Sequence, residues 1–216
     1  EDAVNYPVRP VIALKKPDTG DTVAKTTWHL GDIQARTIGN EVYLFRCISE
    51  NYKDKSNTSK GLALFLCETV IPADIINNPV TEQYETLFFG DTNNYKFSTI
   101  NEWLKENSSD ALFSLSQINI GVDSSYRGQT TKYKFSQLNP NELIKDTFSK
   151  TQAMYSNLFV LSVEEAIQYK DYLWKFADSL IENPETQIKP YCTGYWLRTP
   201  ETDTNDMIYS VNLHDG

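Results

Sequence analysis

Short apolar runs separated by turn-forming residues recur along this chain, which is the pattern of β-strands rather than of long helices. Gly39 and Asn40 stand between two such runs, and both tolerate the positive φ of a tight hairpin turn. The predicted strands lie near Val8–Leu14, Asp32–Ile38, Val42–Ile48, Leu62–Thr69, Gln117–Val122, Leu158–Leu161, Tyr195–Arg198 and Met207–Leu213.

Helix starts are predicted from capping patterns, in which a hydroxyl residue is followed three positions later by a glutamate. The two patterns are Thr99 with Glu102 and Ser162 with Glu165. The second of these helices is expected over Val163–Tyr169, and Pro140 suits the first turn of a further helix over Asn141–Phe148. Strands dispersed among a few helices favour an α+β fold over a doubly wound parallel sheet.

Length and charge narrow the range of functions. No convincing linker divides the 216 residues, so we expect a single domain over residues 1–216. The 29 Asp and Glu outnumber the 20 Lys and Arg, and a net charge of −9 repels phosphate backbones. We therefore expect no nucleic-acid partner. We also expect no membrane insertion, because no apolar stretch approaches the roughly 20 residues that span a bilayer.

The three cysteines, Cys47, Cys67 and Cys192, lie far apart and form no C-x-x-C pair. This spacing removes zinc-ribbon and thioredoxin-like interpretations. Cys47 and Cys67 stand in apolar strands and are expected to be buried free thiols, although one disulfide remains open.

Sequence signatures of catalysis are missing: the chain has no H-E-x-x-H, G-x-S-x-G, Walker or G-x-G-x-x-G motif. Of its two histidines, His29 beside Trp28 is interpreted as structural and His214 as solvated. We expect no catalytic residues, no cofactor and no enzymatic activity. Arg9 and Arg198 lie inside apolar segments, where an unpaired guanidinium is costly, so both are interpreted as structural, with buried hydrogen bonds or a carboxylate pair.

An acidic loop follows the strand that contains Trp196. Its hard oxygen ligands could serve calcium, but they show no recognisable ligand register, and acidic loops are usually solvated. We therefore predict no metal site and leave calcium open. The residues concerned are Glu201, Asp203, Asn205 and Asp206.

Five segments of the chain carry a resemblance to known proteins. They are Trp28–Ile33, Tyr43–Ile48, Asn101–Leu104, Leu158–Ala166 and Tyr195–Arg198. Together they resemble a group of bacterial domains of unknown function with a C-type-lectin-like fold, related to the sulfatase-modifying-factor fold and to retroelement-diversified receptor domains. The resemblance covers nearly all of the chain and implies a mixed or antiparallel sheet with a few helices and long ordered loops. The copper-binding cysteine pair of the sulfatase-modifying enzymes is not reproduced.

One segment departs from the family order. A segment like Val8–Leu14 normally comes last in such domains, after the strand that Met207–Leu213 resembles, whereas here it comes first. This order indicates a circular permutation, or one unit cut from a tandem array. We expect residues 1–14 to complete the sheet beside Met207–Leu213, with residues 15–24 as a linker.

The resemblance implies a non-catalytic recognition or adhesion module of an extracellular or surface-displayed bacterial or phage protein, binding a glycan or a protein. Aromatic faces can stack on sugars or anchor a protein, and carboxylates and amides add directional hydrogen bonds. Two alternatives remain: a glycan-acting hydrolase with carboxylates brought together by the fold, and a structural display or spacer unit. The candidate ligand contacts are Trp196, Glu201, Asp203, Asn205, Asp206 and Tyr209.

Overall fold

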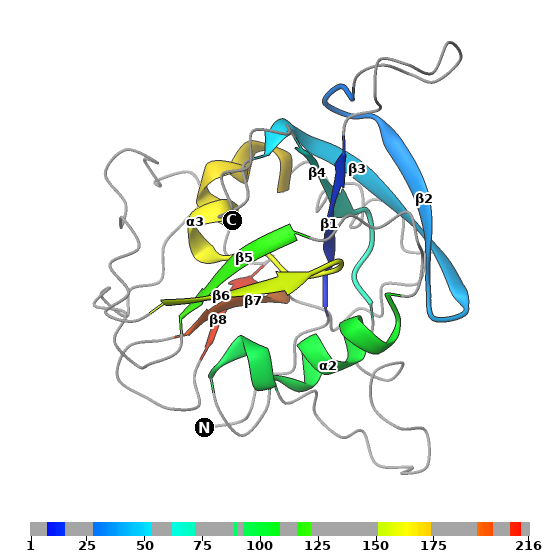
Figure 1. Cartoon of the computed structure of the whole chain (residues 1–216). Coiled ribbons are helices and arrows are strands. Elements are labelled where there is room, and N and C mark those ends of the chain that lie inside the picture. The colour runs from blue at the N-terminus through cyan, green and yellow to red at the C-terminus, as the bar shows by residue number, and fades with distance from the viewer. Residues whose placement is uncertain are drawn as a thin grey trace.

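The described part of the chain has an α+β fold with antiparallel strand pairs and short helices (Figure 1). This confirms the predicted α+β class. The computed structural model describes residues 8–15, 28–52, 62–71, 89, 93–108, 116–121, 151–173, 194–200 and 208–212.

A curled four-stranded sheet forms the largest element, with strand order β1-β4-β3-β2. Every residue of β4 is buried, which explains why its sequence LALFLC is uniformly apolar. Register shifts at Ser49 bend the long strand β3. The strands are β1 (Val11–Lys15), β2 (Ile33–Ile38), β3 (Glu41–Tyr52) and β4 (Leu62–Cys67).

The predicted hairpin between β2 and β3 is confirmed. Ile38 pairs with Glu41 across a two-residue turn, and Gly39 has a φ of +60°. The turn lies against the end of helix α2 (Thr99–Glu106), where the Gly39 amide donates to the Asn107 carbonyl at 3.5 Å. The positive φ favours glycine here, and a Cβ on Gly39 would lie 2.8 Å from Asn107 Oδ1, so the Asn107 side chain would have to shift.

Two further antiparallel pairs complete the described strands. They are β5 (Ser116–Gly121) with β6 (Thr151–Ser156), and β7 (Gly194–Pro200) with β8 (Ile208–Asn212). Strand β6 was not predicted. Its Gln152, Ala153 and Tyr155 are exposed, so its own sequence lacks an apolar pattern, and pairing with β5 defines it.

The helix starts agree with the sequence in one case and differ in the other. Ser162 caps α3 (Val163–Gln168) in a full capping box with Glu165, as predicted. The cap of α2 is Ser98 and not Thr99, so that prediction was wrong by one residue. The Ser98 hydroxyl accepts the amide of Asn101 and donates to the carbonyl of Tyr95, in the preceding 3₁₀ turn η1 (Tyr95–Phe97). The helix expected over Asn141–Phe148 lies outside the described residues.

The segment Leu158–Leu161 is not a strand, although it bonds to two strands. Val11 and Phe159 exchange backbone hydrogen bonds of 2.7 and 3.1 Å, and the Leu161 carbonyl accepts the Arg198 amide at 2.9 Å. This segment therefore connects β1, in the four-stranded sheet, to β7.

The expectation that the first and last strands share a sheet was wrong. Strand β1 belongs to the four-stranded sheet and pairs with β4, whereas β8 pairs with β7. The physical reason is that β4 and Phe159 hydrogen-bond to β1. The expected linker over residues 15–24 lies outside the described part of the chain, except that Lys15 ends β1.

The core contains the two described thiols. Cys47 and Cys67 are both free and fully buried, as the apolar context predicted. Burial raises the pKa of the Cys67 thiol to about 11, so it stays protonated at neutral pH. Cys192 lies outside the described residues. Among those residues, we find no helix of the length and apolarity needed to cross a bilayer.

Candidate functional site

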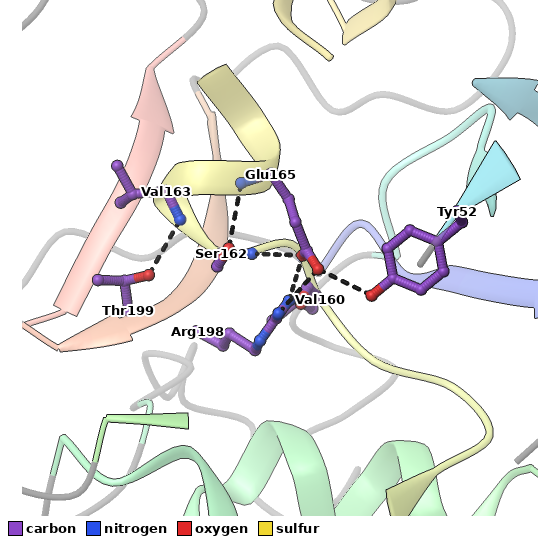
Figure 2. A network of polar contacts seen from close by, with 7 residues as sticks. All are labelled: Tyr52, Val160, Ser162, Val163, Glu165, Arg198 and Thr199. Carbon is purple, nitrogen blue, oxygen red and sulfur yellow. Dashed lines mark hydrogen bonds and ion pairs between the residues drawn. The ribbon is translucent and has the colours of Figure 1, made fainter. Parts of the chain in front are cut away.

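A bulge in β7 directs this strand away from its partner. Trp196 pairs with Ser210 and Pro200 with Ile208, so three residues of β7 stand opposite Tyr209 alone. Two of the three bond instead to the segment that opens helix α3. The Arg198 amide donates to the Leu161 carbonyl at 2.9 Å. The Thr199 hydroxyl accepts the Val163 amide, also at 2.9 Å (Figure 2).

Arg198 points from this bulge into a buried polar cluster, and its side chain is 4% exposed. Its Nη1 donates to the Val160 carbonyl at 2.7 Å and to Oε2 of Glu165, and its Nη2 donates to Oε1 of Glu165 at 2.9 Å (Figure 2). The guanidinium also lies 5.6 Å from the ring centre of Phe159. A two-point ion pair of this kind fixes both side chains in one geometry.

Glu165 is the acceptor on which the cluster converges. Besides Arg198, the Ser162 amide donates to its Oε2 at 3.0 Å and the Tyr52 hydroxyl to its Oε1 at 2.9 Å. Burial by itself would raise the pKa of Glu165, but Arg198 and these hydrogen bonds hold it below its ordinary value. Glu165 is therefore an ionised carboxylate with both oxygens occupied.

The remaining partners are held in the complementary charge state. Burial, followed by the Glu165 charge, raises the pKa of Tyr52, so its hydroxyl remains a donor. Burial opposes the charge of Arg198, yet Glu165 raises the pKa of the guanidinium above its ordinary value. The cluster thus joins β3, α3 and β7 by electrostatics. Its carboxylate has the properties of an anchor, because a general acid requires a raised pKa instead.

Arg9 forms a second buried connection. Its Nε donates to the Cys67 carbonyl of β4 at 2.9 Å, and its guanidinium carbon lies 5.3 Å from the ring centre of Tyr195 in β7. The residue is 1% exposed. Arg9 and Arg198 therefore both make the buried contacts expected of a guanidinium in an apolar segment, and both connect β7 to other elements.

The candidate ligand contacts divide into two groups. Trp196 on β7 and Tyr209 on β8 are half-buried; Trp196 pairs with Ser210 at one end of the bulge, and Tyr209 stands opposite the bulge itself. The rings of Trp196 and Phe89 pack edge to face, with their centres 6.0 Å apart. The ring centres of Phe89 and the fully buried Tyr95 are 6.2 Å apart. Outside the described residues lie Glu201, Asp203, Asn205 and Asp206.

No group of three His, Cys, Asp or Glu suited to a metal ion occurs within the described ranges. The acidic loop considered for calcium, residues 201–206, lies outside these ranges. His29 is exposed on the surface, with Nδ1 3.6 Å from Oε1 of Glu50.

Sequence reasoning missed how these residues come together. The capping pattern placed Glu165 at the start of α3, and the structure adds a second role as the partner of Arg198. An available signal was the buried arginine itself, because a guanidinium in an apolar strand requires a carboxylate or several carbonyls. No local pattern marks Tyr52, which ends a strand 113 positions away from Glu165.

Comparison with known proteins returns no match: no family model, curated protein or solved structure is similar to this chain.

Proposed function

We propose that this chain is a non-catalytic recognition or adhesion module with a C-type-lectin-like fold. In this proposal it belongs to a secreted or surface-displayed bacterial or phage protein and binds a glycan or a protein. The proposed ligand contacts are centred on the β7–β8 hairpin, with Trp196 as the aromatic contact on the face that it shares with Ser210 and Tyr209 as a contact on the other face.

The observation that carries the proposal is the setting of Trp196. Its ring is half-buried, and its edge contact with Phe89 continues to the buried Tyr95. An indole packed against Phe89, which itself packs against a buried ring, has less rotamer freedom to lose when a ligand binds, and this lowers the entropic cost of association. An aromatic surface fixed in this way suits stacking on a sugar ring or anchoring an apolar protein side chain.

The anchoring of β7 gives further support. Arg198 and Thr199 bond to the start of α3, and Arg9 lies against Tyr195, so residues on both sides of Trp196 are tied to other elements. Recognition sites are commonly side chains at the ends of strands, held by a rigid scaffold. The acidic and amide side chains of residues 201–206 follow β7 directly in sequence and would add polar contacts in the same region.

The proposal is tested by screening the folded chain on a glycan array and on a protein array. Any ligand found is then measured against Trp196→Ala and Tyr209→Ala by isothermal titration calorimetry. We expect each variant to weaken binding by about tenfold or more, the loss typical of a buried aromatic contact. Tyr155→Ala is the matched control, because Tyr155 is an exposed aromatic residue on another strand pair. Absence of binding on both arrays, or equal affinity of all three variants, contradicts the proposal.

A further inference from the structure

Strand β2 is an edge strand of the four-stranded sheet (Figure 1). Backbone groups in an antiparallel pair point alternately toward and away from the partner strand. The Asp32 carbonyl accepts the Cys47 amide at 2.8 Å, so Asp32 faces β3 and the residues at 33, 35 and 37 face the open edge. Ile33, Ala35 and Thr37 are all exposed. Among the described residues no strand pairs with this edge, so its outward backbone groups are placed to receive a further strand.

Two side chains of the same strand occupy carbonyls on this open edge. Gln34 Nε2 donates to the Ile33 carbonyl at 2.9 Å, and Arg36 Nη1 donates to the Ala35 carbonyl at 2.7 Å. Arg36 Nη1 also lies 3.4 Å from Gln34 Oε1, so the two side chains contact each other. A strand that added to β2 would need the same carbonyls as acceptors and would have to displace both side chains.

The face beside this edge carries four apolar side chains, together with Thr37 and with Arg46, which is the partner of Ile33. Ile33 and Ala35 share it with Val42 and Leu44 of β3, and Ala35 is paired directly with Leu44. The exposed fractions are 44% for Ile33, 66% for Val42 and 48% for Leu44. Exposed apolar side chains next to an open strand edge favour association of identical chains, because pairing two edges extends both sheets and buries the apolar rows together.

We propose that Gln34 and Arg36 keep a second copy of this chain from pairing with β2. They do so by occupying the carbonyls at Ile33 and Ala35. In an antiparallel β2–β2 pair the outward residues 33, 35 and 37 would face each other, and in the register that sets Ala35 opposite Thr37 the two Arg36 side chains would lie opposite each other, where their like charges would oppose pairing. Arg36 is the only charged residue in the β2 sequence IQARTI, so the repulsive contribution is its own.

The test compares self-association of the wild-type chain with that of Gln34→Thr/Arg36→Thr. Threonine favours strands, but it is too short to cover the neighbouring carbonyl as the longer side chains do. Sedimentation equilibrium over a concentration series measures the oligomeric state, and circular dichroism checks the fold. We expect the wild-type chain to stay monomeric. The double variant should form dimers. Their dissociation constant should be at least about tenfold lower than the dissociation constant of any wild-type dimer.

Two further variants distinguish pairing through the β2 edge from nonspecific association of the chain. Ala35→Pro in the double variant removes an outward amide that does not face β3, and proline is tolerated at such an edge position, so it should restore the monomer. Lys96→Thr changes the net charge by the same amount at an exposed site elsewhere and should leave the chain monomeric. If the double variant fails to fold, Arg36→Thr alone takes its place.

Three results would overturn the inference. The first is a folded double variant that stays monomeric. The second is a dimer that Ala35→Pro does not reverse, which would indicate association through the apolar face alone. The third is a wild-type chain that already dimerises and is made monomeric by Ala35→Pro, because the edge would then be open with both side chains in place.

Discussion

Arg198 donates to both carboxylate oxygens of Glu165, which joins the bulge of β7 to the first turn of α3. The pair is buried, with side-chain exposures of 4% and 13%. Removing either charge leaves the other without its main partner in a poorly solvated site. The described fold is therefore sensitive to substitution of either residue.

Substitution of either partner should destabilise the chain strongly. We expect Arg198→Met and Glu165→Gln each to lower the free energy of unfolding by about 3–5 kcal/mol, because each leaves a buried charge or its hydrogen-bond partners unmatched. The double variant should lose clearly less than the sum of the two. Urea unfolding followed by circular dichroism measures all three, and additive losses would contradict the coupling.

The ion pair between Arg46 and Glu68 provides a more exposed comparison for the Arg198–Glu165 pair. Its side chains are 31% and 19% exposed, so it lies nearer to solvent. Surface pairs contribute about 0–1 kcal/mol, and we expect Arg46→Met to cost correspondingly little. A loss from Arg46→Met as large as that from Arg198→Met would show that burial is not what makes the deeper pair important.

Stability should fall in acid partly through Glu165. The pKa of this carboxyl is lowered in the folded chain, so the unfolded chain binds the proton more tightly. Its contribution is complete above the ordinary glutamate pKa of about 4.3 and is lost as the pH falls through the lower folded-state value. Denaturation curves between pH 6 and pH 3 should therefore show a weaker pH dependence for Glu165→Gln than for the wild type. If Glu165→Gln depends on pH as steeply as the wild type, Glu165 does not have this role. The same follows if Glu102→Gln, a change at an exposed carboxylate, weakens the pH dependence as much as Glu165→Gln does.

Alanine substitutions at Gly39 and Gly31 distinguish the cost of backbone strain from the cost of steric crowding. Both have a positive φ, +60° and +86°, but a Cβ at Gly39 would lie 2.8 Å from Asn107 Oδ1, whereas Gly31 has open space around it. We expect Gly31→Ala to cost about 1 kcal/mol from strain alone, and Gly39→Ala to cost more. Thermal and urea unfolding of the two variants measure the difference. Equal losses would mean that the turn does not press against the end of α2.

The start of α2 is decided between two neighbouring residues. Ser98→Ala should cost about 1 kcal/mol or more, because the hydroxyl bonds to the Asn101 amide and to the Tyr95 carbonyl. Thr99→Ala should change stability little, since Thr99 is exposed and lies inside the helix. Equilibrium unfolding distinguishes the two, and a larger loss at Thr99 would restore the cap that the sequence pattern favoured.

Much of the described secondary structure could be predicted because its causes are local. The turn at Gly39 depends on which residues tolerate positive φ, and the Ser162 capping box depends on two side chains three positions apart. The α2 cap was misplaced because Ser98 and Thr99 have the same capping chemistry, and only the Tyr95 carbonyl decides between them. Strand β6 was missed because its exposed side chains give no apolar alternation.

The candidate site could be predicted only in part. A buried arginine in an apolar segment requires hydrogen-bond or carboxylate partners. The buried contacts of Arg9 and Arg198 could therefore be predicted from the sequence. The identity of those partners does not. Glu165 lies 33 positions from Arg198, and Tyr52 lies 113 positions from Glu165.

The sequence by itself determined most of the strand runs, although not β6, and it determined the hairpin and the Ser162 cap, because each depends on propensities and hydrogen bonds within a few neighbouring residues. The tertiary structure alone decided the sheet to which β1 belongs, the bulge that turns β7 toward α3, and the convergence of Tyr52 and Arg198 on Glu165. These features depend on which distant segments pack together. Packing is set by the balance of burial and charge pairing over the whole chain, which no local pattern records.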